Sequence, residues 1–466
     1  MKLVYNVKDK PKFGQLIVFA FQQLLAIMAA TLVVPVIING NIADAVEAGT
    51  ITWDVNTQMS PAAALFGAGI GTLVYLAFTK MKSPVFLGSS FAFIGSMTAA
   101  FAGAASMAAG YMGLIIGAAM AGLVYVVIAI LVKFVGVGWL NKIMPAVVIG
   151  PTVAIIGLSL AGNAIGFLQT APAGGHKLIA VLCGIVTLLV TMVCSTYGKK
   201  GIKLIPFIIG ILSGYAVASV FTLIGTLADI PALMVVNFAP ITALWEGGIG
   251  LHTFFQLPDF TFVTAFKGVK EIDGAYLGTL AAAYIPVAMV VFAEHIADHK
   301  NISSIIEKDL LDDPGLANTL LGDGIGSMAG AFFGGCPNTT YGESVACVAI
   351  TGNASVATIF TTAICAIIIS FLSPFVAFVN SIPSCVMGGV CVALYGFIAV
   401  SGLKMIQKVD FEESRNLFVV SAILIAGIGG LTLSFGAITI TSIATALILG
   451  IIVNLVLSKG KSKDNA

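Results

Sequence analysis

The chain has 466 residues, of which 59% are hydrophobic and only 9% are charged, and its net charge at pH 7 is +1. Soluble domains carry about 25% charged residues, so this composition excludes an ordinary soluble domain and indicates a polytopic membrane protein. The small net charge, with Arg415 as the single arginine, excludes a basic surface for nucleic acid.

Long apolar segments predict fourteen membrane spans, since one span needs ~20 apolar residues. If the N-terminus is cytoplasmic, every basic residue except Lys177, Lys267 and Lys270 falls in a loop on that side. This asymmetry fits the positive-inside rule with both termini inside and an even number of spans. A count of thirteen or twelve follows instead if a short broken segment is re-entrant. In chain order the spans are predicted at 14–38, 61–79, 84–103, 108–132, 143–163, 178–197, 204–226, 277–298, 316–333, 336–351, 355–378, 383–402, 415–432 and 435–457.

Three connecting segments are long enough to carry structure of their own. On the outer side, Asn41 to Ser60 and Leu227 to Gly274 form long loops. The second loop joins the two halves of the chain and would hold either an interfacial helix or a lid. On the inner side, the polar segment Ile302 to Asp313 predicts a short amphipathic surface helix.

The first seven and the last seven spans echo each other. Pro145–Gly150 opens span five, and the similar Pro383–Gly388 opens span twelve. Seven spans separate the two positions, an odd number, so the repeated unit would be inverted in the membrane. Spans three and ten form a second pair, because each is short and broken, at Ser83–Phe91 and at Gly334–Glu343. Paired broken spans indicate a transporter site at the repeat interface, the alternative being chance similarity of Gly- and Pro-rich apolar sequence.

Acidic residues at membrane depth indicate a binding site. No Asp or Glu lies between Asp54 and Asp229, whereas Glu294 and Glu343 stand within predicted spans. An ionised carboxylate in hydrocarbon costs several kcal/mol, so each must be neutral, paired or solvated in a cavity. For Glu294 the alternative to a binding role is a protonated interhelical hydrogen bond. Glu343 would also cap the N-terminus of a half-helix, which is compatible with ligand binding.

Two further polar residues follow Glu294 on the same predicted helix. Asp298 lies four residues later and shares its face, which suggests a proton path from the inside to Glu294. The alternative for Asp298 is a surface acid paired with Lys300. His295 lies about 100° round the helix, where an interhelical hydrogen bond and a role in proton transfer are equally consistent with the sequence.

Other patterns predict no chemistry. Gly324–Ala329 matches a dinucleotide-binding fingerprint, but no strand precedes it, so it is interpreted as close helix packing by small residues. The cysteines lack metal-ligand spacing, and the sequence contains no nucleophile–base arrangement and no HExxH motif. We therefore expect no metal, no cofactor and no enzymatic activity.

Several sequence blocks resemble the nucleobase–ascorbate transporter family, and most closely its bacterial uracil permease branch. The two most specific blocks are Lys308–Leu316 and Pro337–Glu343. The other matching blocks are Gln22–Gln23 with Thr31–Pro35, Gly69–Thr72, Gly88–Phe93 and Ala293–His295. The resemblance implies an all-α polytopic membrane protein with fourteen transmembrane segments in two inverted seven-span repeats. It also implies short strands in broken spans three and ten that meet at the substrate.

The same resemblance implies a division into a core and a gate. The core would comprise spans 1–4 and 8–11, and the gate would comprise spans 5–7 and 12–14. The corresponding residues are 1–135 and 276–380 for the core, 228–275 for the extracellular loop, and 136–227 and 381–466 for the gate.

The function implied by the resemblance is proton-coupled uptake of uracil by alternating access, in the cytoplasmic membrane and with both termini cytoplasmic. The family also suggests a homodimer through the gate spans. Carboxylates would accept from the two N–H groups of this small neutral nucleobase, and exposed backbone amides would donate to its two carbonyls. Proton coupling would fall to Glu294 and Asp298. The substrate-binding residues carried over by position are Phe91, Glu294, Tyr341, Gly342 and Glu343.

The chain departs from the family pattern beside the expected site. Asp298 and Gln23 stand where the family often has His, and Ser344 follows Glu343 where the branch usually has Asn. These departures leave xanthine or another oxopurine as an alternative substrate, and they leave sodium as an alternative to the proton. An exchanger or channel for sulfate or bicarbonate with the same architecture is a further alternative, although two acids at the site disfavour an anionic ligand.

Overall fold

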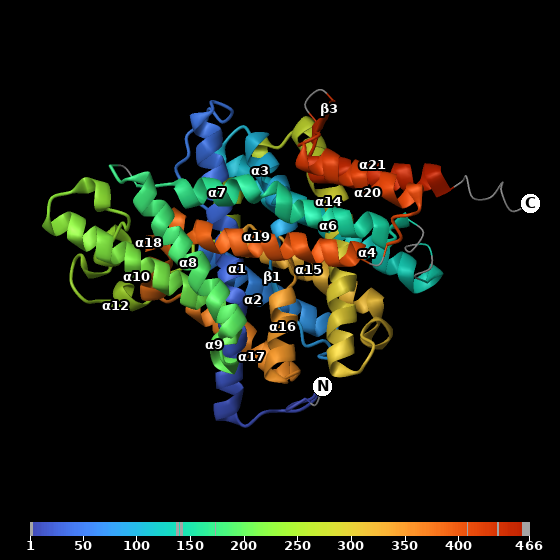
Figure 1. The fold of residues 1–466 in the computed structure, drawn as a ribbon, viewed down its shortest axis with the longest axis horizontal. Coiled ribbons are helices and arrows are strands. Elements are labelled where there is room, and N and C mark those ends of the chain that lie inside the picture. Colours follow the sequence, from blue (N-terminus) through green and yellow to red (C-terminus); the bar gives the residue numbers. More distant parts are fainter. Residues whose placement is uncertain are drawn as a thin grey trace, which may run out of the picture.

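The computed structural model describes residues 3–136, 139, 143–172, 174–407, 409–435 and 438–458. The described part is mostly helical, and long helices from distant parts of the sequence lie side by side (Figure 1). The lysines of the predicted charge asymmetry at positions 2, 142, 408, 459, 461 and 463 lie outside the described residues.

The elements follow one another along the chain in three parts. The first part holds α1 (Phe13–Glu47), α2 (Pro61–Phe78), β1 (Leu87–Ser89), η1 (Phe91–Phe93), α3 (Ile94–Ala102), α4 (Met107–Val135), α6 (Ala146–Ser159), α7 (Ala161–Gln169), α8 (Lys177–Tyr197), α9 (Lys200–Leu204) and α10 (Pro206–Leu227). The connecting loop holds η2 (Pro231–Leu233), α11 (Ala239–Thr242), η3 (Ala243–Trp245), α12 (Leu251–Phe254), α13 (Thr261–Ala265) and η4 (Phe266–Glu271). The last part holds α14 (Gly274–Ile306), the π-helical η5 (Leu311–Gly315), α15 (Leu316–Gly334), β2 (Asn338–Thr340), α16 (Gly342–Thr351), α17 (Val356–Ile369), α18 (Ser373–Ser381), α19 (Ser384–Ile406), α20 (Ser414–Ile428), β3 (Leu433–Phe435), β4 (Ile438–Ile440) and α21 (Ser442–Ser458).

Eight helices of the described residues are long and apolar enough to cross a membrane, and five shorter apolar helices accompany them. Each predicted span overlaps at least one helix of the structure. The helical membrane-protein class is therefore confirmed, whereas the count of fourteen spans and the inverted repeat stay predictions.

The first outer loop is shorter than expected. α1 does not end near residue 38 but continues to Glu47, with Pro35 inside it, so the prediction of a loop from Asn41 is wrong. Ile42 is buried with 2% of its surface exposed, which keeps the extra turns packed. The amide of Asn39 donates to Met59 O at 2.9 Å and accepts from Met59 N at 2.8 Å. Burial and these two hydrogen bonds offset the polar character of the extra turns.

The segment from Ile302 to Asp313 is not a separate surface helix, so that prediction is also wrong. Ile302 is fully buried and keeps α14 packed as far as Ile306. Glu307 then adopts a left-handed conformation with φ of 52°, which ends the helix. The chain turns through η5 directly into α15.

Charge pairs fix this turn between α14 and α15. The Asp313 carboxylate contacts the ammonium groups of Lys82 and Lys308, the second at 2.7 Å. Lys308 and then Lys82 lower the pKa of Asp313 from 3.8 to about 2. Because its pKa is lowered, the carboxylate stays ionised above about pH 2, and the ion pairs are lost only as the pH falls through that value.

The loop from Leu227 to Gly274 is helical in several short pieces, and its roles as an interfacial segment or a lid stay predictions. It folds into short helices that pack against helices on two sides. Near α12, Gln256 N donates to Phe371 O at 2.9 Å and Ser373 Oγ donates to His252 O at 2.7 Å. α13 packs on α4 and α15, and its Phe262 ring stacks on Phe332 with centroids 4.9 Å apart.

The helices pack in two groups. In the first group, α15 contacts α2 and α4, α14 contacts α3 and α4, and α17 contacts α1 and α2. In the second group, α19 contacts α6, α7 and α8, while α20 contacts α6 and α21. The antiparallel pair of β1 and β2 belongs to the first group, where both strands contact α15.

The N-terminal segment fastens the end of α16. Val4 N donates to Gly352 O at 2.8 Å, and Ala354 N donates to Tyr5 O at 2.9 Å, in the turn that links α16 to α17. Ser355 Oγ donates to Asp9 O at 2.6 Å. These contacts hold the far end of the short helix whose first turn carries Glu343.

Glycines let α2 and α15 approach closely. A Cβ on Gly71 would lie 2.7 Å from Gly326 O, and a Cβ on Gly326 would lie 2.7 Å from Gly71 O. Both distances are shorter than real Cβ contacts allow, so both positions require glycine. The interpretation of Gly324–Ala329 as a helix-packing segment is thus confirmed.

We predict that Gly71→Ala destabilises the protein by about 1–3 kcal/mol, because the added methyl overpacks the contact between α2 and α15. Gly396→Ala is the matched control, since a Cβ on Gly396 meets no atom of the described residues within 4 Å. That control should be neutral or slightly stabilising. Thermal unfolding in detergent measures both, and equal midpoints for the two variants would contradict the packing argument.

Candidate functional site

Two broken segments meet in an antiparallel strand pair. In its register Leu87 lies opposite Thr340, Gly88 opposite Thr339 and Ser89 opposite Asn338. Ser90 N extends the pair by donating to Pro337 O at 2.9 Å. Backbone groups at membrane depth need partners within the protein, and here each strand supplies them to the other. The strands expected in broken spans three and ten are confirmed.

Side chains from neighbouring helices hold the strands in place. Thr72 Oγ1, on α2, accepts from Leu87 N at 2.9 Å and donates to Leu87 O at 3.2 Å. Tyr341 Oη donates to Ser89 O at 2.8 Å, so its ring lies across β1. A Cβ on Gly88 would collide with that ring, which explains the glycine in this strand.

A cavity of about 350 Å³ lies beside the strand pair and is lined by both helix groups. Its apolar wall includes Val153 of α6, Phe207 of α10, and Leu394 and Phe397 of α19. The six residues expected at the site all line this cavity, namely Phe91, Glu294, Asp298, Tyr341, Gly342 and Glu343. The structure therefore brings them together, while their roles in binding stay predictions.

Three carboxylates border the cavity. Glu294 and Asp298 lie one turn apart on α14, and Glu343 lies in the first turn of α16. Asp298 Oδ2 accepts from Thr340 Oγ1 at 2.9 Å, so Asp298 turns toward β2. Among the described residues, no hydrogen-bond donor reaches the Glu294 carboxylate. Gly342 leaves its backbone exposed at the start of α16, where helix N–H groups have no intrahelical acceptor.

These groups define what the cavity can bind. The carboxylates offer hydrogen-bond acceptors, the start of α16 offers backbone donors, and Phe91 and Tyr341 offer flat apolar surface. This set fits a small uncharged ring that carries both N–H groups and carbonyls. It does not fit an anion, which three carboxylates would repel.

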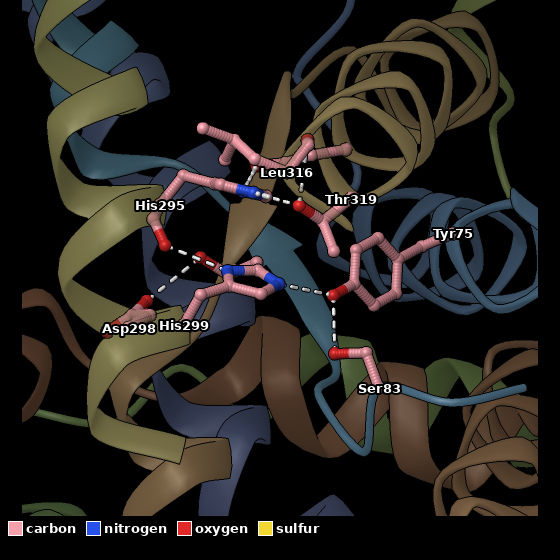
Figure 2. Close-up of polar contacts among 9 residues, drawn as sticks. Tyr75, Ser83, His295, Asp298, His299, Leu316 and Thr319 are labelled. Carbon is pink, nitrogen blue, oxygen red and sulfur yellow. Dashed lines mark hydrogen bonds and ion pairs between the residues drawn. The ribbon is translucent and has the colours of Figure 1, made fainter. Parts of the chain in front are cut away.

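A fully buried polar network lies behind the carboxylates, between α14 and α15 (Figure 2). His295 Nδ1 is 2.7 Å from Asp323 Oδ2, and His295 Nε2 is 3.0 Å from Thr319 Oγ1. Thr319 Oγ1 donates its proton to Leu316 O at 3.0 Å. His295 Nε2 must then donate to Thr319, and one further proton is shared by His295 and Asp323. The pair therefore carries no net charge, which suits its complete burial.

The network continues from His295 to His299 one turn along α14. His299 Nδ1 lies 2.8 Å from His295 O, and a carbonyl only accepts, so this nitrogen carries a proton. In the neutral ring Nε2 is then an acceptor, and it lies 2.7 Å from the Tyr75 hydroxyl. Tyr75 also contacts Ser83 at 2.6 Å, as Figure 2 shows. The two histidines thus tie α14 to α2 and α15.

Another buried contact joins α1 to the start of α16. Gln23 Nε2 donates to Ser344 Oγ and to Ser344 O, and Phe86 N donates to Ser344 Oγ at 3.0 Å. Ser344 follows Glu343 directly, so this hydroxyl positions the turn that carries the carboxylate. The contact connects three segments that are distant in sequence.

Sequence reasoning missed Asp323 and the partners of the site acids. Asp323 was visible as an acidic residue in the middle of the predicted span 316–333. Of the two readings for His295, the structure shows the interhelical hydrogen bond, to Asp323 and Thr319. Nothing in the sequence pairs Thr340 with Asp298, because that contact depends on the register of β2.

Comparisons with known proteins agree with this architecture. A family model described as the permease family matches residues 14–435. A uracil permease of Bacillus caldolyticus is 36% identical over 459 residues, which cover 98% of this chain and 95% of that protein. A uracil permease of Bacillus subtilis (strain 168) is 36% identical over 472 residues, covering 99% and 97%. A uracil permease of Escherichia coli (strain K12) is 34% identical over 455 residues, covering 97% and 93%.

Solved membrane transporters share the fold. The transmembrane domain of the cyanobacterial bicarbonate transporter BicA has a TM-score of 0.55 at 16% identity, covering 97% of this chain and 100% of that chain. Murine Slc26a9, an anion transporter in the inward-facing state, has a TM-score of 0.63 at 11% identity, covering 97% and 69%. At these identities the likeness shows the fold alone. The apolar helices and the permease relatives together indicate an integral membrane protein.

We predict that Asp323→Ala destabilises the protein by about 3–5 kcal/mol, because it leaves His295 buried without its partner. Asp323→Asn should cost less, since its amide N–H can donate to Nδ1 of the neutral His295 ring while Nε2 still donates to Thr319. Asp312→Ala, at an exposed acid in the turn before α15, is the control and should change little. Thermal unfolding in detergent measures the three, and an Asp323→Ala variant as stable as the control would contradict the assigned pair.

Proposed function

This chain belongs to the permease family, the nucleobase–ascorbate transporters that its motifs resembled, and from that membership we propose that it transports uracil. Members of this family are permeases and not enzymes. The proposal places the chain in the cytoplasmic membrane with both termini inside. It also takes residues 1–135 and 276–380 as the core and residues 136–227 and 381–466 as the gate. The two helix groups in the structure support this division, and the homodimer stays a prediction.

The observation that carries the proposal is the convergence of Glu294 and Glu343 on one cavity with flat aromatic walls. Uracil is neutral and presents two N–H donors and two carbonyl acceptors. The carboxylates match the donors, and backbone N–H groups at Gly342 and Glu343 match the carbonyls. A buried donor or acceptor left unpaired costs about 1–3 kcal/mol, so this match would select the base without any charge on the ligand. Curated relatives named as uracil permeases support uracil over xanthine or another oxopurine.

Proton coupling follows from the same acids. Keeping Glu294, Asp298 and Glu343 all ionised within hydrocarbon would cost several kcal/mol for each charge. We assign the coupled proton to Glu294, which no described donor reaches, with Asp298 as the adjoining site toward the inside. Protonation of Glu294 would remove one of these charges from the loaded cavity and so lower the cost of moving the core with its substrate.

An anion exchanger is the rival function with the same fold, since the solved neighbours carry anions. Its ligand would need a cation in the cavity. The cationic residue in the lining is Lys203, which is exposed at the edge of the cavity on α9, whereas three carboxylates lie further in. The charge distribution therefore favours a neutral ligand.

Alternating access requires contacts that open and close on each side of the cavity. One candidate lies near the C-terminal end of α1, on the opposite side of the cavity from α9. Asn163 Nδ2 of α7 donates to Asn41 Oδ1 of α1 at 2.6 Å, and Asn41 Nδ2 donates to Thr98 Oγ1 of α3 at 3.0 Å. The Phe167 ring also packs directly over Gly40. Figure 1 shows α9 beside the N-terminal half of α1 and α7 beside its C-terminal half. We infer that these contacts close the outer side of the cavity.

We predict that proteoliposomes containing the protein accumulate labelled uracil in response to an inward proton gradient. Xanthine and bicarbonate should not be accumulated. Glu294→Gln should abolish concentrative uptake, because the amide cannot take up a proton. Ala297 lies on the same helix and lines the cavity without titrating, so Ala297→Ser serves as the control.

The result that rejects the proton mechanism is normal gradient-driven uptake by Glu294→Gln. Uptake that follows a sodium gradient in place of the proton gradient would assign the coupling ion differently. Xanthine uptake without uracil uptake would reject the substrate.

We predict that a cysteine pair, Asn41→Cys with Asn163→Cys, forms a disulfide that locks the outer side shut. Uracil transport should stop on oxidation and return on reduction, while uracil binding in detergent persists. The two single variants are the controls and should be insensitive to the oxidant. Full transport by the oxidised, cross-linked pair would show that this contact does not open during the cycle.

A further inference from the structure

The hydroxyl of Thr339 stands out among the polar groups that line the cavity. Thr339 lies at the centre of β2 with 2% of its surface exposed, and it borders the cavity. Its neighbours on the strand are both engaged, since Asn338 Nδ2 donates to Gly67 O at 3.1 Å and Thr340 Oγ1 donates to Asp298. The Thr339 hydroxyl is buried and has no hydrogen-bond partner among the residues that the structure describes. A buried hydroxyl without a partner lowers stability unless something else bonds to it.

The strand geometry explains why this hydroxyl is not hydrogen-bonded as its neighbours are. Successive side chains of a strand point to opposite faces, so Thr339 faces away from the side of Asn338 and Thr340. Its backbone position is fixed by the pairing with Gly88. The hydroxyl is therefore presented by a rigid element and not by a mobile loop.

The other polar groups of the cavity are mainly hydrogen-bond acceptors, so a further side-chain donor would complement them. Glu294, Asp298 and Glu343 supply acceptors when ionised. The hydroxyl of Tyr341 already donates to Ser89 O. Of the described residues in the lining, Thr339 is the buried hydroxyl that still has a proton to donate. A ring with N–H groups and carbonyls has donors that match the acids. Each of its carbonyl oxygens can accept two hydrogen bonds, so the backbone N–H groups of Gly342 and Glu343 leave room for a further donor.

We propose that the Thr339 hydroxyl donates a hydrogen bond to a carbonyl oxygen of the transported base and so contributes to its selection. The inference rests on the proposed function, because it assigns a specificity-determining residue within the same cavity. The methyl group of Thr339 would pack in the wall, and the hydroxyl would distinguish a carbonyl from a poorer acceptor at that position of the ring.

The test is equilibrium binding of uracil, 2-thiouracil and 4-thiouracil to the purified full chain in detergent. A thiocarbonyl is a weak hydrogen-bond acceptor, so it removes the ligand half of the contact. Thr339→Val keeps the shape of the side chain and removes the protein half. It should bind uracil roughly tenfold more weakly, the size expected for one hydrogen bond. It should also lose the preference of the unaltered chain for uracil over one of the two thio analogues.

Three controls accompany this cycle. Thr339→Ser restores the hydroxyl and should retain both affinity and preference. Thr191→Val removes a buried hydroxyl that donates to Thr187 O within α8, and it should leave uracil binding unchanged. Thermal unfolding identifies a variant that fails to fold, and Thr339→Ala then replaces Thr339→Val in the cycle.

Two results overturn the inference alone. One is uracil affinity in Thr339→Val equal to that of the unaltered chain. The other is an equal loss of affinity for uracil and both analogues, which would show a structural role. If the unaltered chain binds no uracil, the proposed function fails and the Thr339 contact falls with it, so the two failures are distinguishable.

Discussion

The pairing of β1 with β2 is the contact on which the rest of the structure depends. Each strand interrupts a helical segment, and an interrupted helix exposes N–H and C=O groups that have no water to bond in the membrane. Each strand satisfies the other, and Thr72 satisfies both backbone groups of Leu87 on the outer edge. Breaking the pair would leave several backbone groups unbonded, at a cost of several kcal/mol each in hydrocarbon. The strand pair therefore holds the two broken segments together and sets where α16 begins.

Buried charge is handled in two different ways around this strand pair. Asp323 is sealed between α14 and α15, and its charge is compensated within the protein by His295. Glu294 and Glu343 border the cavity, and Glu294 lacks a described donor. An acid that is hydrogen-bonded and paired within the protein stabilises the fold. An acid beside a cavity whose carboxylate oxygens lack donors can instead bind a ligand and a proton. The distinction depends on partners, because all three acids lie on apolar helices.

The sequence predicts the architecture well wherever one local feature decides the outcome. Long apolar runs predicted the helices, and the Gly- and Pro-containing breaks predicted where two spans are interrupted, whereas the strands at those breaks were implied by the family resemblance. The end of α1 and the turn after α14 were predicted wrongly, since burial of Ile42 and Ile302 overrides the polar residues around them. The site residues Glu294 and Glu343 were predicted because they are acidic residues within apolar spans. The contacts of Thr340 with Asp298 and of Thr319 with His295 depend on strand register and helix packing, which no single segment encodes.

The departures from the family pattern illustrate the same limit. Taken one at a time, Gln23 and Ser344 each differ from the residue expected by resemblance, and each weakens the assignment of the substrate. In the structure they bond to each other, and Ser344 also accepts from Phe86 N. A short hydroxyl on α16 needs a partner that reaches it, and the amide of Gln23 does so from α1. The two differences form one contact that holds the turn carrying Glu343, so together they are a single departure from the family pattern. Neither residue is part of the cavity lining, so this departure lies behind the cavity.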